Sequence, residues 1–208
     1  MTVHTKPYLT PEEYLALERA AETRSEYLDG EMIAMTGVSI RHSTIVTNLV
    51  LELGTQLKGR PCSVHANDLR VSVPDTRLYT YPDVIVVCGE PALADDYRDT
   101  LTNPIVLIEV LSPSTEAYDR GTKFEHYRTL DSLREYLLVS QDRPRIEQFI
   151  RQEDGSHWLF IEVPDLSSNV LLPSISCRLA LADIYDRVKY DERKAEAGSP
   201  PRPPAPKP

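Results

Sequence analysis

The sequence predicts an α/β fold in which a mixed β-sheet is flanked by helices, and three observations support this prediction. Residues 83–88 and 105–111 are nearly continuous apolar runs rich in β-branched side chains, which is typical of central strands covered on both faces. Residues 41–58 carry apolar side chains at helical spacing and end before a glycine, a C-cap signal. The dipeptide Asp29-Gly30 separates two short strand-like runs and indicates a hairpin.

The first helix is indicated by a capping box, because Thr10 and Glu13 flank Pro11 at the first helical position; it should end near residue 21 or 22. Ser114 or Thr115 can open a later helix. Short runs of β-branched and aromatic residues predict the strands. The other expected elements are hairpin strands at 25–28 and 31–36, strands near 63–65 and 69–73, a polar turn at 74–77, a helix from 114 or 115 to about 130, strands near 135–139, 145–150 and 158–163, and a helix at 181–188.

Length and composition predict one folded domain and a separate tail. The 208 residues suffice for one well-packed core, which we expect to span residues 1–188. Residues 189–208 carry five basic residues, three acidic residues and six of the seventeen prolines. We expect this charged, proline-rich tail to be disordered or to bind an unknown partner. The net charge is −9 for the whole chain, so the domain itself carries about −11.

Charge and cysteine content limit the classes of function. The acidic domain argues against broad non-specific binding of nucleic acid, but not against an enzyme with a carboxylate-lined metal site. The three cysteines are far apart and lack CxxC spacing, so we expect reduced thiols and a cytoplasmic protein. No apolar run approaches the length of a membrane span, about 18 residues, and we expect no membrane association. The histidines lack zinc-ligand spacing, and no glycine-rich phosphate loop occurs.

Two acidic residues interrupt the strongest predicted strands. Asp83 opens one apolar run, and Glu109 lies near the end of the other. A lone buried carboxylate is costly unless it is paired or binds a cation, so a shared divalent metal explains both residues. Mg²⁺ or Mn²⁺ takes oxygen ligands, and the backbone carbonyl of Val110 would join the two carboxylates. The alternative is that each acid only accepts backbone hydrogen bonds at a strand end.

A series of motifs resembles a known family in the same order along the chain. The motifs are Tyr27-Leu28-Asp29-Gly30-Glu31, Arg41-His42-Ser43, Tyr81-Pro82-Asp83-Val84, Ile108-Glu109-Val110-Leu111-Ser112-Pro113-Ser114-Thr115, Asp119 to Lys123 with Tyr127, and Glu135-Tyr136 leading into Leu137-Leu138-Val139. Over about residues 8–187 the chain resembles the Uma-two family of restriction endonucleases, within the PD-(D/E)xK nuclease superfamily. The resemblance implies a restriction-endonuclease-like core and metal-dependent hydrolysis of DNA.

One position departs from the superfamily pattern, which places a lysine two residues after the strand glutamate. This chain has Leu111 there, and residues two apart on a strand share a face, so that strand supplies no positive charge. Lys123 is the expected replacement, because it shares one stripe of its helix with Tyr127 and Leu130 and should point toward the sheet. The alternative is a snorkelling lysine whose stem covers apolar surface.

Four further residues are candidates for the same site. The resemblance places Glu31 as the third acidic member, although Glu31 could equally be an exposed hairpin acid, and Glu26 is a similar candidate. His42 begins the long helix, where it could orient a water or a phosphate, or could only cap the helix or face solvent. Ser112 belongs to a hydroxyl-rich run that could bind phosphate at a helix N-terminus, or could be a plain loop and N-cap.

These observations lead to one functional hypothesis and two alternatives. The hypothesis is a Mg²⁺- or Mn²⁺-dependent endonuclease that hydrolyses DNA, with Glu31, Asp83, Glu109 and Lys123 as catalytic residues. A homodimer is expected, because cutting two strands requires two sites. The first alternative is a nuclease fold that no longer cleaves and acts as an interaction module. The second is a nuclease for RNA or small phosphodiesters.

Overall fold

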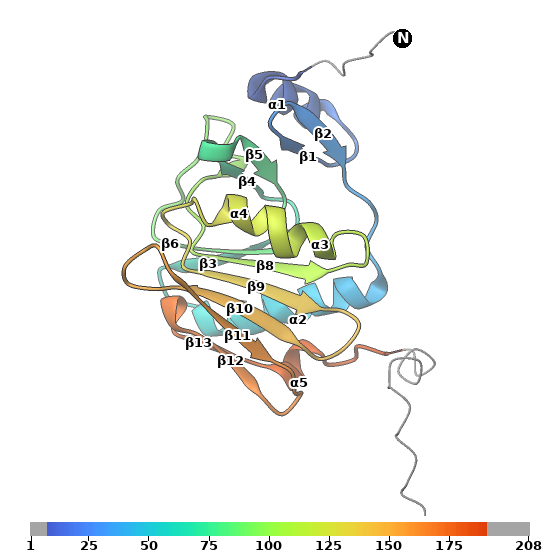
Figure 1. The fold of residues 1–208 in the computed structure, drawn as a ribbon, viewed down its shortest axis with the longest axis vertical. Helices are drawn as coiled ribbons and strands as arrows, with labels where there is room; N and C mark the ends of the chain where they lie inside the picture. The colour runs from blue at the N-terminus through green and yellow to red at the C-terminus, as the bar shows by residue number, and fades with distance from the viewer. Residues whose placement is uncertain (1–7, 191–208) are drawn as a thin grey trace, which may run out of the picture.

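The computed structural model of this chain describes residues 8–190, in which two large sheets and their helices share one core (Figure 1). In chain order the helices and strands are α1 (Pro11–Ala20), β1 (Ser25–Leu28), β2 (Glu31–Ala34), α2 (Ile40–Leu57), β3 (Cys62–Ala66), β4 (Arg70–Val73), β5 (Leu78–Thr80), β6 (Val84–Cys88), β7 (Thr100–Leu101), β8 (Val106–Leu111), α3 (Glu116–Tyr118), α4 (Phe124–Tyr127), β9 (Glu135–Ser140), β10 (Ile146–Arg151), β11 (Trp158–Val163), β12 (Asn169–Leu172), β13 (Cys177–Ala180) and α5 (Leu181–Ile184).

A mixed six-stranded sheet forms the centre of the fold, with strand order β11-β10-β9-β8-β6-β3. Strands β8 and β9 run parallel, whereas the other neighbouring pairs of this sheet are antiparallel. In β8, Val106, Ile108 and Val110 face one core cluster, and Leu107 and Leu111 face another. The strand is therefore buried on both sides, which is why its sequence reads as a continuous apolar run. The predicted fold class, a mixed sheet flanked by helices, is confirmed.

Different layers cover the two faces of this sheet (Figure 1). One face packs against α2, whose side chains Ile45, Leu49 and Leu53 are fully buried together with residues of β12, β13 and α5. The other face packs against α4 and against a five-stranded sheet of order β2-β1-β5-β4-β7. The hairpin β1–β2 was predicted correctly: Asp29 and Gly30 both take positive φ, 40° and 100°, as a two-residue hairpin turn requires.

A buried polar network ties α1 to the chain just before β6. The Arg70 side chain is 2% exposed; its Nε donates to the Tyr81 hydroxyl at 2.9 Å and its Nη1 donates to Thr100 at 3.0 Å. Tyr81 in turn donates to Glu18 of α1, also at 2.9 Å. A buried guanidinium without hydrogen-bond partners would cost much free energy, so these contacts are kept. They fix the position of Tyr81 and therefore of residues 82 and 83, which follow it.

The helix predicted from residue 114 or 115 to about 130 is not uniform. It consists of α3, a π-helical turn, η2 (Asp119–Lys123), and α4. A π-turn accommodates one more residue than an α-turn and changes which side chains face inward, an effect that apolar periodicity does not reveal. The strands β5, β7, β12 and β13 were also missed; each has only two to four residues, and periodicity alone cannot identify strands of that length.

Glu135, one of the motif residues, lies away from the other acidic motif residues and holds two parts of the fold together. It is fully buried at the start of β9, and its Oε1 accepts hydrogen bonds from the Ser174 amide at 2.9 Å and the Ser174 hydroxyl at 2.5 Å. Its Oε2 accepts from Gln148 Nε2 at 2.5 Å. The carboxylate therefore joins the β12–β13 connection to the central sheet. Because Glu135 pairs with Val106 at the start of β8, it lies at one end of the β8–β9 pair, and Glu109 lies near the other end.

The expectation of three reduced cysteines is wrong for two of them. Cys62 of β3 and Cys88 of β6 form a disulfide, because the antiparallel register places them directly opposite each other. Sequence spacing could not show this, since 26 residues separate them. Cys177 remains a buried free thiol.

The predicted domain bounds, residues 1–188, stay a prediction, because residues 1–7 and 191–208 lie outside the described part of the chain. The Tyr190 ring lies 6.4 Å from the ring of Tyr185, so the packed part of the chain continues slightly past residue 188. Residues 191–208 lie outside the described residues, and disorder of the tail and its binding of a partner stay predictions. Within residues 8–190, no helix combines the length and apolar character needed to cross a membrane. The cytoplasmic location also stays a prediction.

Candidate functional site

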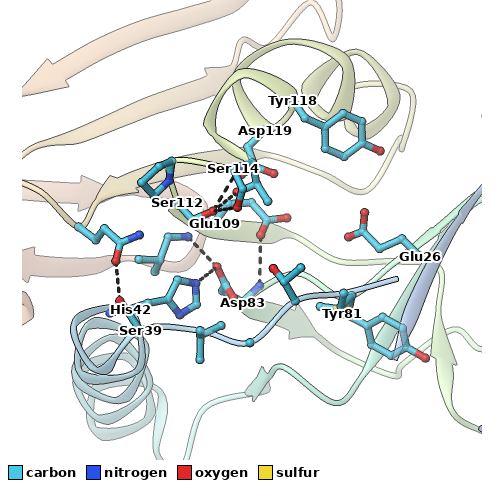
Figure 2. Close-up of a pocket in the computed structure, with 18 of the residues that line it drawn as sticks. Glu26, Ser39, His42, Tyr81, Asp83, Glu109, Ser112, Ser114, Tyr118 and Asp119 are labelled. Carbon is cyan, nitrogen blue, oxygen red and sulfur yellow. Dashed lines mark hydrogen bonds and ion pairs between the residues drawn. The ribbon is translucent and has the colours of Figure 1, made fainter. Parts of the chain in front are cut away.

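A pocket of about 680 Å³ opens where the start of β6 meets the end of β8. Four segments surround it: the connection from β2 into α2, the start of α2, the loop 112–115 after β8, and the α3–η2 helix (Figure 2). Most of the residues singled out from the sequence line this pocket. They are Glu26, His42, Asp83, Glu109, Val110, Ser112 and Lys123.

Asp83 and Glu109 lie next to each other because β6 and β8 are antiparallel. The register pairs Val84 with Ile108, so the residue before β6 lies opposite the residue after Ile108. The Asp83 amide donates to Glu109 Oε2 at 3.4 Å, and the Val110 amide donates to Asp83 Oδ2 at 2.7 Å (Figure 2). The two carboxylates that interrupt the apolar strands thus meet in the pocket.

Lys123 projects from the π-turn into the same pocket. Its Nζ lies 3.0 Å from Glu109 Oε1, 3.0 Å from Glu26 Oε1 and 3.5 Å from Asp119 Oδ1, and its side chain is only 6% exposed. The amine therefore reaches the carboxylates and does not snorkel to solvent. Leu111, in contrast, is buried in the apolar cluster beneath α4, where a lysine would lack a partner.

Three carboxylates share one lysine, and the electrostatics reflect this excess of negative charge. Burial raises the pKa of Glu109 to about 8, assisted by Asp119, Asp83 and Glu26 and opposed by Lys123. Burial also raises the pKa of Asp119. For Lys123, burial favours the neutral amine, but the neighbouring carboxylates outweigh it and hold the pKa well above its ordinary value. The lysine is therefore charged, and the carboxylates remain short of positive charge.

Glu26, and not Glu31, is the hairpin acid in the pocket. Glu26 pairs with Ile33 across the hairpin, contacts Lys123, and accepts a hydrogen bond from the Thr80 hydroxyl. Glu31 is exposed and pairs with Leu28 beside the turn. It shares a face with Glu26 but lies two residue pairs closer to the turn, roughly 7 Å along the strand. The placement of Glu31 in the site is therefore corrected.

His42 contacts Asp83 from the N-terminus of α2. Its Nε2 lies 3.1 Å from Asp83 Oδ2, and its buried Nδ1 has no hydrogen-bond partner among residues 8–190. The helix start is held by Ser39, whose hydroxyl accepts from the His42 amide at 3.1 Å and donates to Gln141 at 2.7 Å. Gln141 Nε2 donates to the Leu111 carbonyl at 2.9 Å, so the helix start is tied to the end of β8.

The loop after β8 presents a group of hydroxyls to the pocket. The Ser112 Oγ lies 3.0 Å from the Ser114 Oγ and 2.9 Å from the Thr115 Oγ1, and it accepts from the Thr115 amide at 3.2 Å. These contacts are those of a capping loop, while the same side chains line the pocket. Both interpretations of Ser112 from the sequence therefore remain compatible with its position.

The donor set fits a hard divalent cation. The pocket offers carboxylates, hydroxyls and backbone carbonyls, which are the oxygen ligands that Mg²⁺ or Mn²⁺ takes. Burial is the main cause of the raised pKa of Glu109, and the neighbouring carboxylates add to it. Among residues 8–190, no three His, Cys, Asp or Glu side chains are grouped to hold a metal on their own.

The chain is similar to known proteins in both sequence and fold. Residues 11–182 match the Uma2 family, whose description is "Putative restriction endonuclease". The chain belongs to the Uma2 family. The resemblance seen in the motifs is confirmed, and the match spans both carboxylates, Lys123 and the sheet that positions them.

Two relatives of this Uma2 chain come from Synechocystis sp., and both are named as uncharacterized proteins. Slr1290 is 40% identical over 181 residues, which cover 86% of this chain and 92% of that protein. Sll1609 is 36% identical over 163 residues, or 78% of this chain and 92% of that protein. A crystal structure titled as a putative nuclease belonging to DUF820, from Anabaena variabilis, has the same fold. Its TM-score is 0.70 at 21% identity, covering 86% of this chain and 98% of that chain.

The candidate site contains two further residues, Asp119 and Tyr127, that belong to the family motifs but had no predicted role. Asp119 is 3% exposed and lies on the π-turn, four residues before Lys123, with which it forms an ion pair. Tyr127 donates its hydroxyl to Glu109 Oε1 at 2.8 Å and is fully buried. The i, i+4 spacing of both residues from Lys123 was the available signal, because such residues lie on one helix face.

Proposed function

We propose that this Uma2-family chain is a metal-dependent endonuclease that hydrolyses phosphodiester bonds of DNA. The observation that carries the proposal is the meeting of Asp83 and Glu109 in one pocket with Lys123 Nζ 3.0 Å from Glu109. When bound there, Mg²⁺ or Mn²⁺ would lower the pKa of an attacking water and offset the charge of the phosphate. Asp83, Glu109 and the carbonyl of Val110 would hold the ion.

The remaining residues position groups around that ion. Lys123 would orient the nucleophile and stabilise the negative charge that develops on the phosphate oxygens. Glu26 and Asp119 keep Lys123 protonated and directed into the pocket, at 3.0 and 3.5 Å. Tyr127 fixes Glu109 Oε1, and Oε2 lies on the side of Asp83, where it accepts from the Asp83 amide at 3.4 Å. Glu26 thus takes the place that the sequence had suggested for Glu31.

The proposal is tested by metal-dependent cleavage with the full chain. We expect nicking of plasmid DNA with Mg²⁺ or Mn²⁺, and none with EDTA. Asp83→Asn should abolish nicking and weaken Mn²⁺ binding, measured by titration calorimetry without DNA. Bound Mn²⁺ with no cleavage of DNA, RNA or a simple phosphodiester would indicate the inactive interaction module. Cleavage that survives EDTA, or absence of Mn²⁺ binding, would contradict the proposal. Homodimerisation stays a prediction, to be checked by sedimentation.

His42 is expected to position Asp83. Because its Nε2 at 3.1 Å is the side-chain contact to Asp83 Oδ2, the pair holds that carboxylate in one orientation. His42→Leu should weaken Mn²⁺ binding by roughly 10- to 100-fold, the usual effect of losing a residue that orients a metal ligand. His42→Gln, which keeps an N–H donor, should recover part of the affinity. Electron paramagnetic resonance of Mn²⁺ measures both. Equal affinity in the parent and His42→Leu would exclude this role.

A further inference from the structure

The pocket has few positive charges to spare for a long nucleic acid. Its lining includes five carboxylates, but the cations that line it are Arg41 and Lys123. Lys123 is engaged by Glu26, Glu109 and Asp119, and Arg41 Nη1 lies 3.3 Å from Asp142. Duplex DNA carries one charge per about 1.7 Å, and its affinity comes largely from Lys and Arg contacts to several phosphates. This pocket suits a single phosphodiester better than a row of them.

One wall of the pocket is apolar and exposed. Strand β2 and the segment that joins it to α2 run along that side (Figure 2), and three of their lining side chains are open to solvent. Ile33 is 45% exposed, Met35 42% and Val38 63%. Exposed apolar side chains beside a strongly charged site indicate a ligand that carries both a charged group and an adjacent apolar surface. A nucleobase attached to a phosphodiester has that form, and apolar side chains pack against unstacked bases in enzymes that take a base out of a duplex.

Another part of the lining is polar. Ser112, Ser114 and Thr115 present hydroxyls from the loop after β8, and Tyr118 adds a ring. Hydroxyls can donate to or accept from the edge of any base, so they hold a base without selecting a sequence. A volume of about 680 Å³ lies within the range of small-ligand pockets, and it exceeds what a lone phosphate and an ion need.

We propose that this pocket binds one unpaired nucleotide, with its base against Ile33, Met35 and Val38 and its phosphodiester at Asp83 and Glu109. The preferred substrate class is then single-stranded nucleic acid, or a nucleotide turned out of a duplex, and not an intact paired one. The position of the phosphate rests on the proposed function, whereas the position of the base rests on the apolar wall. The two can therefore fail separately.

The experiment compares two esters with the same leaving group, using the full chain and Mn²⁺. Thymidine 5′-(p-nitrophenyl phosphate) carries a base, and methyl p-nitrophenyl phosphate does not. Met35→Glu and Val38→Glu should raise KM for the thymidine ester about tenfold, the effect of losing one apolar contact to the base, and leave KM for the methyl ester unchanged. Ile40→Glu is the matched control, because Ile40, the first residue of α2, is 88% exposed and close in sequence to Val38 but does not line the pocket.

A binding measurement without turnover gives a second readout. In Ca²⁺, fluorescence anisotropy of a labelled single-stranded octanucleotide should show tighter binding than its duplex, with affinity that falls only slightly with salt because few phosphates are contacted. Equal binding of duplex and single strand, equal KM for both esters, or a change in both esters with Met35→Glu would overturn the base site while leaving the nuclease proposal intact. Lack of hydrolysis of either ester together with lack of Mn²⁺ binding would overturn the proposed function itself.

Discussion

Replacing Glu109 with glutamine is expected to reduce cleavage by about 10³-fold or more, because a divalent ion contributes several kcal/mol to the stabilisation of the reacting charge. Glutamine keeps the shape of the side chain and an oxygen that can accept from the Tyr127 hydroxyl, which lies 2.8 Å from Glu109 Oε1. It removes the negative charge that would hold the ion. Mn²⁺ affinity should fall at least tenfold, because mutation of residues that support a metal site usually costs about 10- to 100-fold in affinity. Calorimetry measures this affinity in the absence of substrate.

The matched control for this change is Glu135→Gln. Glu135 is also a fully buried strand glutamate, but it lies at the far end of the β8–β9 pair and binds Ser174 and Gln148. Its replacement should lower the unfolding temperature and leave Mn²⁺ affinity unchanged. If Glu109→Gln cleaves DNA and binds Mn²⁺ as the parent does, then Glu109 only accepts hydrogen bonds at a strand end, the alternative that its position in the sequence left open.

Replacing Lys123 with methionine is expected to have two separable effects. Activity should fall by about 10²- to 10³-fold, the cost of losing one charged donor to the transition state. Stability should also fall by about 3–5 kcal/mol, because removing one partner from a buried ion pair leaves its carboxylates uncompensated. Glu26, Glu109 and Asp119 all lose their common cation. Single-turnover cleavage and urea unfolding measure the two effects.

Metal binding separates the role of Lys123 from that of Glu109. Lys123→Met should bind Mn²⁺ as the parent does, since the carboxylates remain, whereas Glu109→Gln should bind it at least tenfold more weakly. Lys123→Arg restores the charge and should recover most of the stability, but less of the activity, because a guanidinium does not replace a compact ammonium. Lys58→Met, at an exposed position after α2, serves as the surface control. Parent-level cleavage and stability in Lys123→Met would remove the lysine from the mechanism.

Local sequence patterns predicted much of the fold. The capping box at Thr10, the hairpin turn at Asp29-Gly30 and the helical stripe of α2 appear at the expected residues, to within one or two positions at their ends. These features depend on residues close together in the chain, where propensity and periodicity act directly. The short strands and the π-turn escaped prediction, because their two to five residues give too few repeats of an apolar pattern to identify the element.

Part of the candidate site could likewise be predicted from local sequence patterns. The sequence by itself determined that Asp83 and Glu109 are unusual, because a carboxylate within an apolar strand is costly and therefore stands out in any context. It also determined that the strand supplies no positive charge beside Glu109. Strand periodicity places residue 111 on the same face as Glu109, and residue 111 is a leucine. Family membership followed from the order of the motifs. These conclusions need no knowledge of which strands are neighbours.

Only the tertiary structure decided which side chains meet. The antiparallel register of β6 and β8 brings Asp83 to Glu109, the π-turn aims Lys123 at them, and the hairpin register selects Glu26 over Glu31. The same kind of register brings Cys62 to Cys88. Each of these contacts joins residues distant in sequence, and their proximity comes from packing of the whole core, which sets strand order and register. A pattern within one segment carries no record of that packing.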